Sequence, residues 1–269
     1  MNETFQEVLT AAVRDITERG YRSPEQIDEW IKRLRLAAIA KLPAATSDNQ
    51  LRAALRAALK RGVSKTAVMK NHPGVDHFTV RNIEPQFRAI LDRRILAATD
   101  LIKLNRDQAV ETTLRRFSGW ATSIPDGGSR VVDRQEVKEH IAKPLRSQTY
   151  EERRLAIDQG HKLLSSVNAV IAEQSGAIAG VWRSNWRQPG YDYRPDHKER
   201  DQRVYLIRGS WAHQQGLVKA GRAGYLDEIT QAAEEPFCRC WVRYVTTLRD
   251  VPADMLTEKG KKTLERVRL

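Results

Sequence analysis

Apolar residues recur every three or four positions along the first half of the chain, a pattern that predicts amphipathic helices. The clearest start signal is Ser23, which is followed by Pro24 in the first turn and by Gln26 as a capping-box partner. This signal predicts a helix over residues 23–42. Leucines at four-residue spacing predict a second helix over residues 49–61, which a glycine ends.

The following segment, residues 62–80, shows little periodicity and predicts a short helix with an irregular connection after it. Helical spacing resumes over residues 84–104 and continues to Phe117. Asn105 and Asp107 offer a break or a cap between the two parts. The sequence therefore predicts two consecutive helices whose apolar positions form core.

A turn-rich linker at residues 123–129 precedes a short helix, which Asp133 starts and which we expect to stop near Pro144. Another capping-box pattern, Thr149 with Glu152, then starts a further helix. The N-terminal helical region is therefore expected to close between these two helices.

The composition of the chain changes at Gly176, where that last helix is expected to end. Glycine, tryptophan, tyrosine and β-branched residues become more frequent, and the best strand candidates are residues 177–183 and 203–209. We therefore expect an α+β protein with two parts. A helical N-terminal region, residues 1–147, is followed by a small α+β domain, residues 148–269.

The composition and charge place limits on the class of protein. Hydrophobic residues make up 41% of the chain and charged residues 30%, which favours folded cores. Without a run of about 18 apolar residues, and with an amphipathic, acid-containing N-terminus, we expect no membrane span, no signal peptide and synthesis in a cytoplasm. The net charge of +12 favours a polyanion such as DNA as partner. A basic surface that serves solubility is an equally weighted alternative.

The residues that suggest chemistry lie in one stretch of the second half. They are Asp192, Arg194 and His197 in DYRPDH, His213 in SWAH, and Cys238 and Cys240 in PFCRC. Two imidazoles and two thiolates could fill a tetrahedral zinc site, with His197, His213, Cys238 and Cys240 as ligands. The favoured alternative is that both cysteines pack as small hydrophobes on one side of a strand while the histidines make local hydrogen bonds. A disulfide between residues two apart would be strained.

Arginine and aromatic side chains are interleaved in the same stretch, a mixture suited to stacking on bases and pairing with phosphates. The arginines that would contact DNA are Arg183, Arg187, Arg200, Arg203 and Arg208. A small domain core with snorkelling arginines is the alternative interpretation. Asp192 and Arg194 are expected to orient each other or to bind the backbone of their loop.

Several classes of enzyme lack their signatures in this sequence. Neither a P-loop nor a GxGxxG motif after a strand is present, which disfavours packaging ATPases and dinucleotide-dependent enzymes. Apart from a thiol pair of Cys238 with His197 or His213, no nucleophile with an adjacent base and no carboxylate cluster is recognisable. We therefore expect no enzyme activity.

Three motifs in a fixed order carry a resemblance to a known family. They are GVWR with Trp182, D-x-R-x-x-H with Asp192, Arg194 and His197, and P-x-C-R-C with Pro236, Cys238, Arg239 and Cys240. This order resembles the phage head morphogenesis domain typified by the F protein of phage Mu. The resemblance covers about residues 149–247, and the long insertion SNWRQPGYDY before the second motif departs from the family pattern.

The resemblance implies a Mu F-like C-terminal domain in a minor head protein of a tailed bacteriophage. Such proteins are present in few copies and associate with the portal inside the procapsid, in some cases binding packaged DNA. The implied partners are the portal protein, the major capsid or scaffolding protein and genomic double-stranded DNA, with zinc as the cofactor considered. The implied location is the capsid interior, after synthesis in the host bacterial cytoplasm.

Two other functions are kept as alternatives. The first is a zinc-stabilised DNA-binding or DNA-modifying protein of a phage or mobile element. The second is a host-modifying enzyme ejected with the genome, whose activity would depend on His197 or Cys238. By elimination, the N-terminal helices are the expected contact with the portal or capsid.

Overall fold

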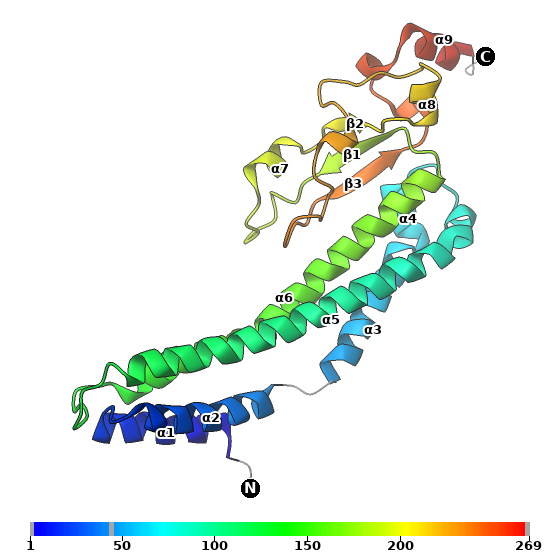
Figure 1. The fold of residues 1–269 in the computed structure, drawn as a ribbon. Helices are drawn as coiled ribbons and strands as arrows, with labels where there is room; N and C mark the ends of the chain where they lie inside the picture. The colour runs from blue at the N-terminus through cyan, green and yellow to red at the C-terminus, as the bar shows by residue number, and fades with distance from the viewer. Residues whose placement is uncertain (1–2, 43–45, 267–269) are drawn as a thin grey trace. The chain divides into compact units, whose positions relative to one another are not determined.

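The computed structural model describes residues 3–42 and 46–266, most of them in helices (Figure 1). The long helical part consists of α1 (Phe5–Arg19), α2 (Pro24–Lys41), α3 (Thr46–Gly62), α4 (Lys65–Asn71), α5 (His77–Ala121) and α6 (Arg134–Gln174). A small sheet of β1 (Ala179–Arg183), β2 (Val204–Leu206) and β3 (Trp241–Val245) follows, with the short helices α7 (Pro195–Glu199), α8 (Trp211–Gln214) and α9 (Glu258–Arg266). Single 3₁₀ turns lie at Leu226–Glu228, Leu248–Asp250 and Ala253–Met255. The expected α+β class is confirmed, and within the described residues no helix is long and apolar enough to cross a membrane.

Local start signals in the sequence were good guides to where helices begin. The Ser23 hydroxyl accepts a hydrogen bond from the Gln26 backbone N–H at 3.4 Å, and Pro24 occupies the first turn of α2. Asp133 caps α6 by accepting from two backbone N–H groups of its first turn. Both predicted helix starts are confirmed. They could be predicted from the sequence because each cap depends only on neighbouring residues.

The break expected at Asn105 and Asp107 is wrong, because α5 continues through both residues and already begins at His77. Ile102 and Val110 are buried on either side of the expected break, so the apolar stripe of the helix is uninterrupted. Packing of that stripe outweighs the weak helix preference of two polar residues, which amounts to about 0.7 kcal/mol each.

The stop expected near Pro144 is also wrong, because α6 passes through this proline. A proline inside a helix costs about 3 kcal/mol or more, but Ile141 and Leu145 next to it are buried and each contributes about 1.5–3 kcal/mol. Glu152, expected to cap a new helix, instead receives two hydrogen bonds from Arg106, at 2.6 and 3.0 Å. Tertiary contacts therefore override both local signals.

The chain divides into two compact units, which differ from the expected parts 1–147 and 148–269 because the division after residue 147 falls inside α6. Unit 1 comprises residues 1–50 and 98–155, and unit 2 comprises residues 51–97 and 156–269. The helices α5 and α6 each contribute to both units. Residues 51–97, which comprise most of α3, α4 and the first part of α5, therefore belong to the same unit as the C-terminal sheet.

Unit 1 is a helical assembly with one apolar core. Its core is contributed by α1, α2 and the parts of α5 and α6 that belong to this unit, and its fully buried side chains include Leu9, Ile16, Leu34, Phe117 and Ile141. Burial of this kind stabilises the unit without any specific polar site.

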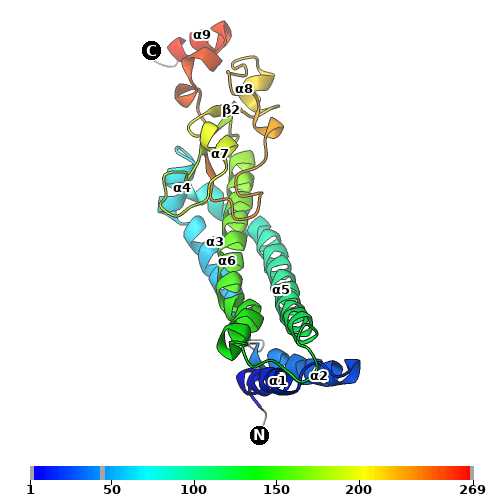
Figure 2. The ribbon, with the colours of Figure 1, turned by 90° about the vertical axis from the view of Figure 1, so that its left-hand side faces the viewer.

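Unit 2 is built around an antiparallel sheet in the order β2-β1-β3. The strands β1 and β2 confirm the two strand predictions, whereas β3 was not predicted. The helix α4 packs against β3, and His72 after α4 hydrogen-bonds Asn168 of α6 at 3.1 Å, so these helices flank the sheet (Figure 2). Residues far apart in sequence are thereby brought to one sheet.

Strand register determines which side chains share a face of this sheet. Trp182 of β1 is paired with Val242 of β3, and both belong to a buried cluster that also contains Cys238 and Cys240. The opposite face carries Arg183 of β1 and its partner Trp241 of β3, beyond Ala179 and Val181, which pack in a second apolar cluster. One face therefore holds the cysteines and the other presents cationic and aromatic side chains.

Candidate functional site

The structure brings residues of all three sequence motifs together in unit 2. Trp182 lies on β1, His197 lies on α7, and Cys238 and Cys240 lie in the irregular segment that leads into β3. The expectation that both cysteines lie on a strand is therefore wrong, although their burial was expected. The indole of Trp182 meets the His197 ring edge-on, with centroids 5.4 Å apart.

The centre of the site is a buried cluster of one imidazole and two thiols. Nδ1 of His197 lies 3.5 Å from Sγ of Cys238 and 3.6 Å from Sγ of Cys240. The three ligand atoms all lie within 4.8 Å of one another, and each residue is at most 2% exposed. Imidazole nitrogen and thiolate sulfur are the ligands of transition metals such as zinc, so this cluster could hold a metal ion.

The thiols share their protons unequally. A hydrogen bond with Cys240, supported by the nearby His197, lowers the pKa of Cys238 to about 5. The same hydrogen bond and burial raise the pKa of Cys240. Ionisation of Cys238 is therefore favoured over that of Cys240, and loss of the second proton would need a further positive charge, which a metal ion supplies.

The other edge of the imidazole faces a carboxylate that sequence reasoning missed. Nε2 of His197 lies 3.6 Å from Oε2 of Glu235, and this nitrogen is buried without a hydrogen-bond partner. Arg194 of the second motif forms an ion pair with Glu235 and donates to the Pro236 carbonyl at 3.1 Å. Arg194 therefore orients the cysteine segment. Its expected partner Asp192 is exposed, and Arg194 pairs with Glu235 instead.

Hydrogen bonds to α6 and to the long insertion hold the cysteine segment in place. The carboxylate of buried Asp158 on α6 accepts from the backbone N–H of Phe237 at 2.6 Å. Asn185 donates to the Arg239 carbonyl at 3.0 Å, and the Tyr191 hydroxyl accepts from the Arg239 N–H at 3.0 Å. Asn185 and Tyr191 belong to the long insertion of the sequence, so that insertion packs onto the site.

The fourth expected zinc ligand, His213, is not part of the cluster. Its Nδ1 accepts a hydrogen bond from the Gly209 N–H at 3.2 Å, and its ring packs edge-on against Tyr225. This local bonding is what the alternative interpretation expected for a histidine. Among the described residues, the metal-binding group consists of His197, Cys238 and Cys240.

The five arginines considered as DNA contacts fall into different environments. Arg208 pairs with Asp227 and Glu228, and Arg200 pairs with Asp196 on α7, so carboxylates neutralise both. Arg203 lines a separate hollow near Met255. Only Arg183 and Arg187 meet in one hollow, together with cationic residues that the sequence did not single out.

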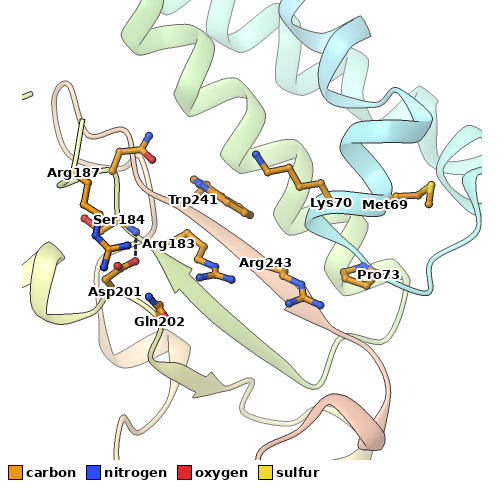
Figure 3. Close-up of a pocket in the computed structure, with 11 residues that line it drawn as sticks. Met69, Lys70, Pro73, Arg183, Ser184, Arg187, Asp201, Gln202, Trp241 and Arg243 are labelled. Atoms are coloured by element: carbon orange, nitrogen blue, oxygen red, sulfur yellow. Dashed lines mark hydrogen bonds between the residues drawn. The ribbon is translucent and has the colours of Figure 1, made fainter. Parts of the chain in front are cut away.

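That hollow has a volume of about 620 Å³ and lies over β1, β3 and α4 (Figure 3). Lys70, Arg183, Arg187 and Arg243 line it around Trp241, and the Lys70 ammonium lies 4.8 Å from the Trp241 ring centroid. The period-two spacing of Trp241 and Arg243 was a signal for a strand with a cationic face. Lys70 comes from a distant helix, so no sequence signal could have added it.

Comparisons of this chain with family models, with curated proteins and with solved structures find no match.

Proposed function

We propose that this chain is a minor head protein of a tailed bacteriophage that acts in head morphogenesis, with a C-terminal part of the Mu F-like type. The observation that carries the proposal is the convergence of the three motifs that resemble this family. Trp182, His197 and Cys240 come from separate segments and meet at one site. Motifs that matched by chance would have no reason to share a site.

We also propose zinc as the ion held by the cluster. Tetrahedral zinc with bonds of about 2.0–2.1 Å to nitrogen and about 2.3 Å to sulfur separates these two atoms by about 3.6 Å. The distances of His197 Nδ1 to Cys238 Sγ and Cys240 Sγ, 3.5 and 3.6 Å, match this separation. His197, Cys238 and Cys240 would supply three of the four ligands of such a shell.

The surroundings of His197 fit a metal ligand. A histidine that binds a metal through one ring nitrogen usually donates its other N–H to a carboxylate. Glu235 is placed for this role, since its buried Oε2 lies 3.6 Å from Nε2 of His197, which has no other hydrogen-bond partner. Arg194 in turn forms an ion pair with Glu235. Within the second motif, Arg194 therefore supports the proposed ligand His197 through Glu235.

The burial of the cluster supports a structural role for the ion. Cys238 is fully buried, and His197 is 1% exposed, so a substrate would not reach either side chain. Zinc there would join α7 to the segment before β3 and would fix the sheet edge between them. This arrangement favours an assembly protein over an ejected enzyme that uses a thiol nucleophile.

The proposed setting is the capsid interior near the portal, after synthesis in the host cytoplasm. The portal protein, the capsid or scaffolding protein and the packaged double-stranded genome are the proposed partners. Unit 1 offers the helical surface for protein contacts, and the charge of +12 suits a protein surrounded by DNA phosphates.

The test is co-purification of the chain with the portal and capsid proteins encoded beside its gene. We expect association with the portal in a few copies per head. A preparation that binds zinc and DNA tightly but never the portal would instead identify the runner-up, a zinc-stabilised DNA-binding protein. An activity lost in His197→Ala would identify the ejected enzyme.

A further inference from the structure

We infer that a basic tract in unit 2 binds the phosphodiester backbone of nucleic acid. Two adjoining hollows form the tract, and they share Lys70, Asn185 and Trp241. The cationic side chains that line them are Arg61, Lys70, Arg183, Arg187, Arg239 and Arg243. The inference deepens the proposed contact with the packaged genome by assigning that contact a surface.

The fold places these charges side by side. Arg183 is the register partner of Trp241, and Val181 is the partner of Arg243, so both arginines and the indole share one face of the sheet. The helix α4 packs against β3 and brings Lys70 over the indole ring. Figure 3 shows these side chains, from two strands and one helix, around one hollow.

The charges of the tract are not neutralised by carboxylates. Asp201 is the single acidic residue that lines either hollow, and its oxygens accept from the Ser184 backbone N–H at 2.9 Å and the Trp186 indole N–H at 3.1 Å. In the part of the chain that the structure describes, none of the six cations forms an ion pair. Arg208, on the same unit, forms two.

Repulsion among neighbouring cations is a cost that a bound polyanion would remove. Nε of Arg183 is a buried donor without a hydrogen-bond partner, and in the second hollow burial, with a smaller effect of Arg239, lowers the pKa of His161. The amides of Asn185 and Gln202 add neutral donors for phosphate oxygens.

The size of the tract favours a polymer over a single small anion. The two hollows measure about 620 and 400 Å³, and six cations line them together. A lone phosphate would engage two or three donors, whereas a backbone with a charge every few ångströms engages all of them. Contacts of this kind position the nucleic acid and carry no base sequence.

The test measures DNA affinity of the full chain by fluorescence anisotropy over a series of salt concentrations, with duplex and single-stranded oligonucleotides of one length. We expect Arg183→Gln/Arg243→Gln to weaken duplex binding at least tenfold. It should also reduce the slope of log affinity against log salt by about 2, since each lost phosphate contact removes about 0.9.

The matched control is Arg134→Gln/Arg208→Gln, which removes the same charge from arginines that pair with Glu18 and with Asp227 and Glu228. It should change affinity less than twofold. Equal losses in both variants, or an unchanged salt slope in the first, would overturn the tract while portal association remained intact. Stronger binding of the single strand, lost in the first variant alone, would support the tract and assign it to single-stranded nucleic acid.

Discussion

The two units of this protein are stabilised in different ways. Unit 1 is held by one continuous apolar core, with Leu34 and Phe117 fully buried among other aliphatic side chains. Unit 2 has apolar clusters on both faces of a three-stranded sheet, and its helices add further buried side chains such as Leu55, Phe87 and Leu163. Of the buried side-chain nitrogen and oxygen atoms without a hydrogen-bond partner among the described residues, all but one, in Thr99, lie in unit 2.

Buried polar atoms without partners are costly, and in native proteins each has a specific cause, such as an ordered water, a bound ion or a catalytic role. Unit 2 has such atoms at His197 beside the cluster of thiols and at Arg183 beside the basic tract. Unit 1 has the properties of a scaffold, whereas unit 2 combines apolar packing with candidate ligand sites. The predictions below test this contrast.

Loss of the metal ion should have the largest effect, and only on unit 2. A ligand at a thousand times its Kd stabilises the folded state by about 4 kcal/mol. For a unit of this size, we therefore expect a chelator to lower the melting temperature of unit 2 by about 10 °C. Hydrogen exchange followed separately in the two units is the measurement, and unit 1 should keep its protection.

Cys240→Ala provides the control for that experiment. The variant should melt at the lower temperature without chelator, and chelator should change it no further. An unchanged melting curve in Cys240→Ala, or an equal response to chelator in variant and parent, would refute a stabilising ion at His197, Cys238 and Cys240.

The next largest effect should come from the core of unit 1. Leu34→Ala removes a fully buried side chain of α2 and should cost about 2–5 kcal/mol of stability. Leu36→Ala, on the same helix but with its side chain 71% exposed, is the matched control and should cost less than about 0.5 kcal/mol. Metal content measured on the folded variants should be the parent's, and a loss of metal in Leu34→Ala would break the proposed separation of roles.

The same contrast explains how much of the fold could be predicted from the sequence. Caps at Ser23 and Asp133 depend on adjacent residues, and they were predicted correctly. The ends expected at Asn105 and Pro144 were wrong because packing in unit 1 carries α5 and α6 through them. Local signals specify where a helix can start, but the tertiary core decides where it stops.

The candidate site was predictable where residue chemistry alone was informative. Imidazole and thiol side chains are uncommon enough that His197, Cys238 and Cys240 stood out in the sequence, and the structure brings them together. Glu235 and Lys70 were missed because glutamate and lysine are common residues, and only the tertiary fold places them beside His197 and Trp241. No local sequence signal predicted that β3 pairs with β1, and this pairing places Trp241 and Arg243 beside Arg183.

A smaller, pH-dependent effect is expected from His72. Burial lowers its pKa to about 4, so the folded unit 2 holds it neutral between Asn168 and the stacked Tyr244 ring. The unfolded chain binds a proton near pH 6.5, so stability falls as the pH drops from 6.5 to 4, by up to about 3 kcal/mol. In His72→Gln, denaturation curves over this range should show a weaker pH dependence, whereas His140→Gln, at an exposed site, should behave as the parent.

The smallest effect should be a coupling between the two sites of unit 2. Arg239 lies between the two cysteines and Trp241 follows them, so a metal ion at the cluster fixes the chain at the centre of the basic tract. We expect chelation to weaken duplex binding about fivefold, at the lower end of measured couplings between sites. The measurement is the DNA affinity of the parent and of Cys240→Ala with and without chelator. If chelator weakened both equally, the tract would not depend on the ion, and the two sites would be neighbours that work independently.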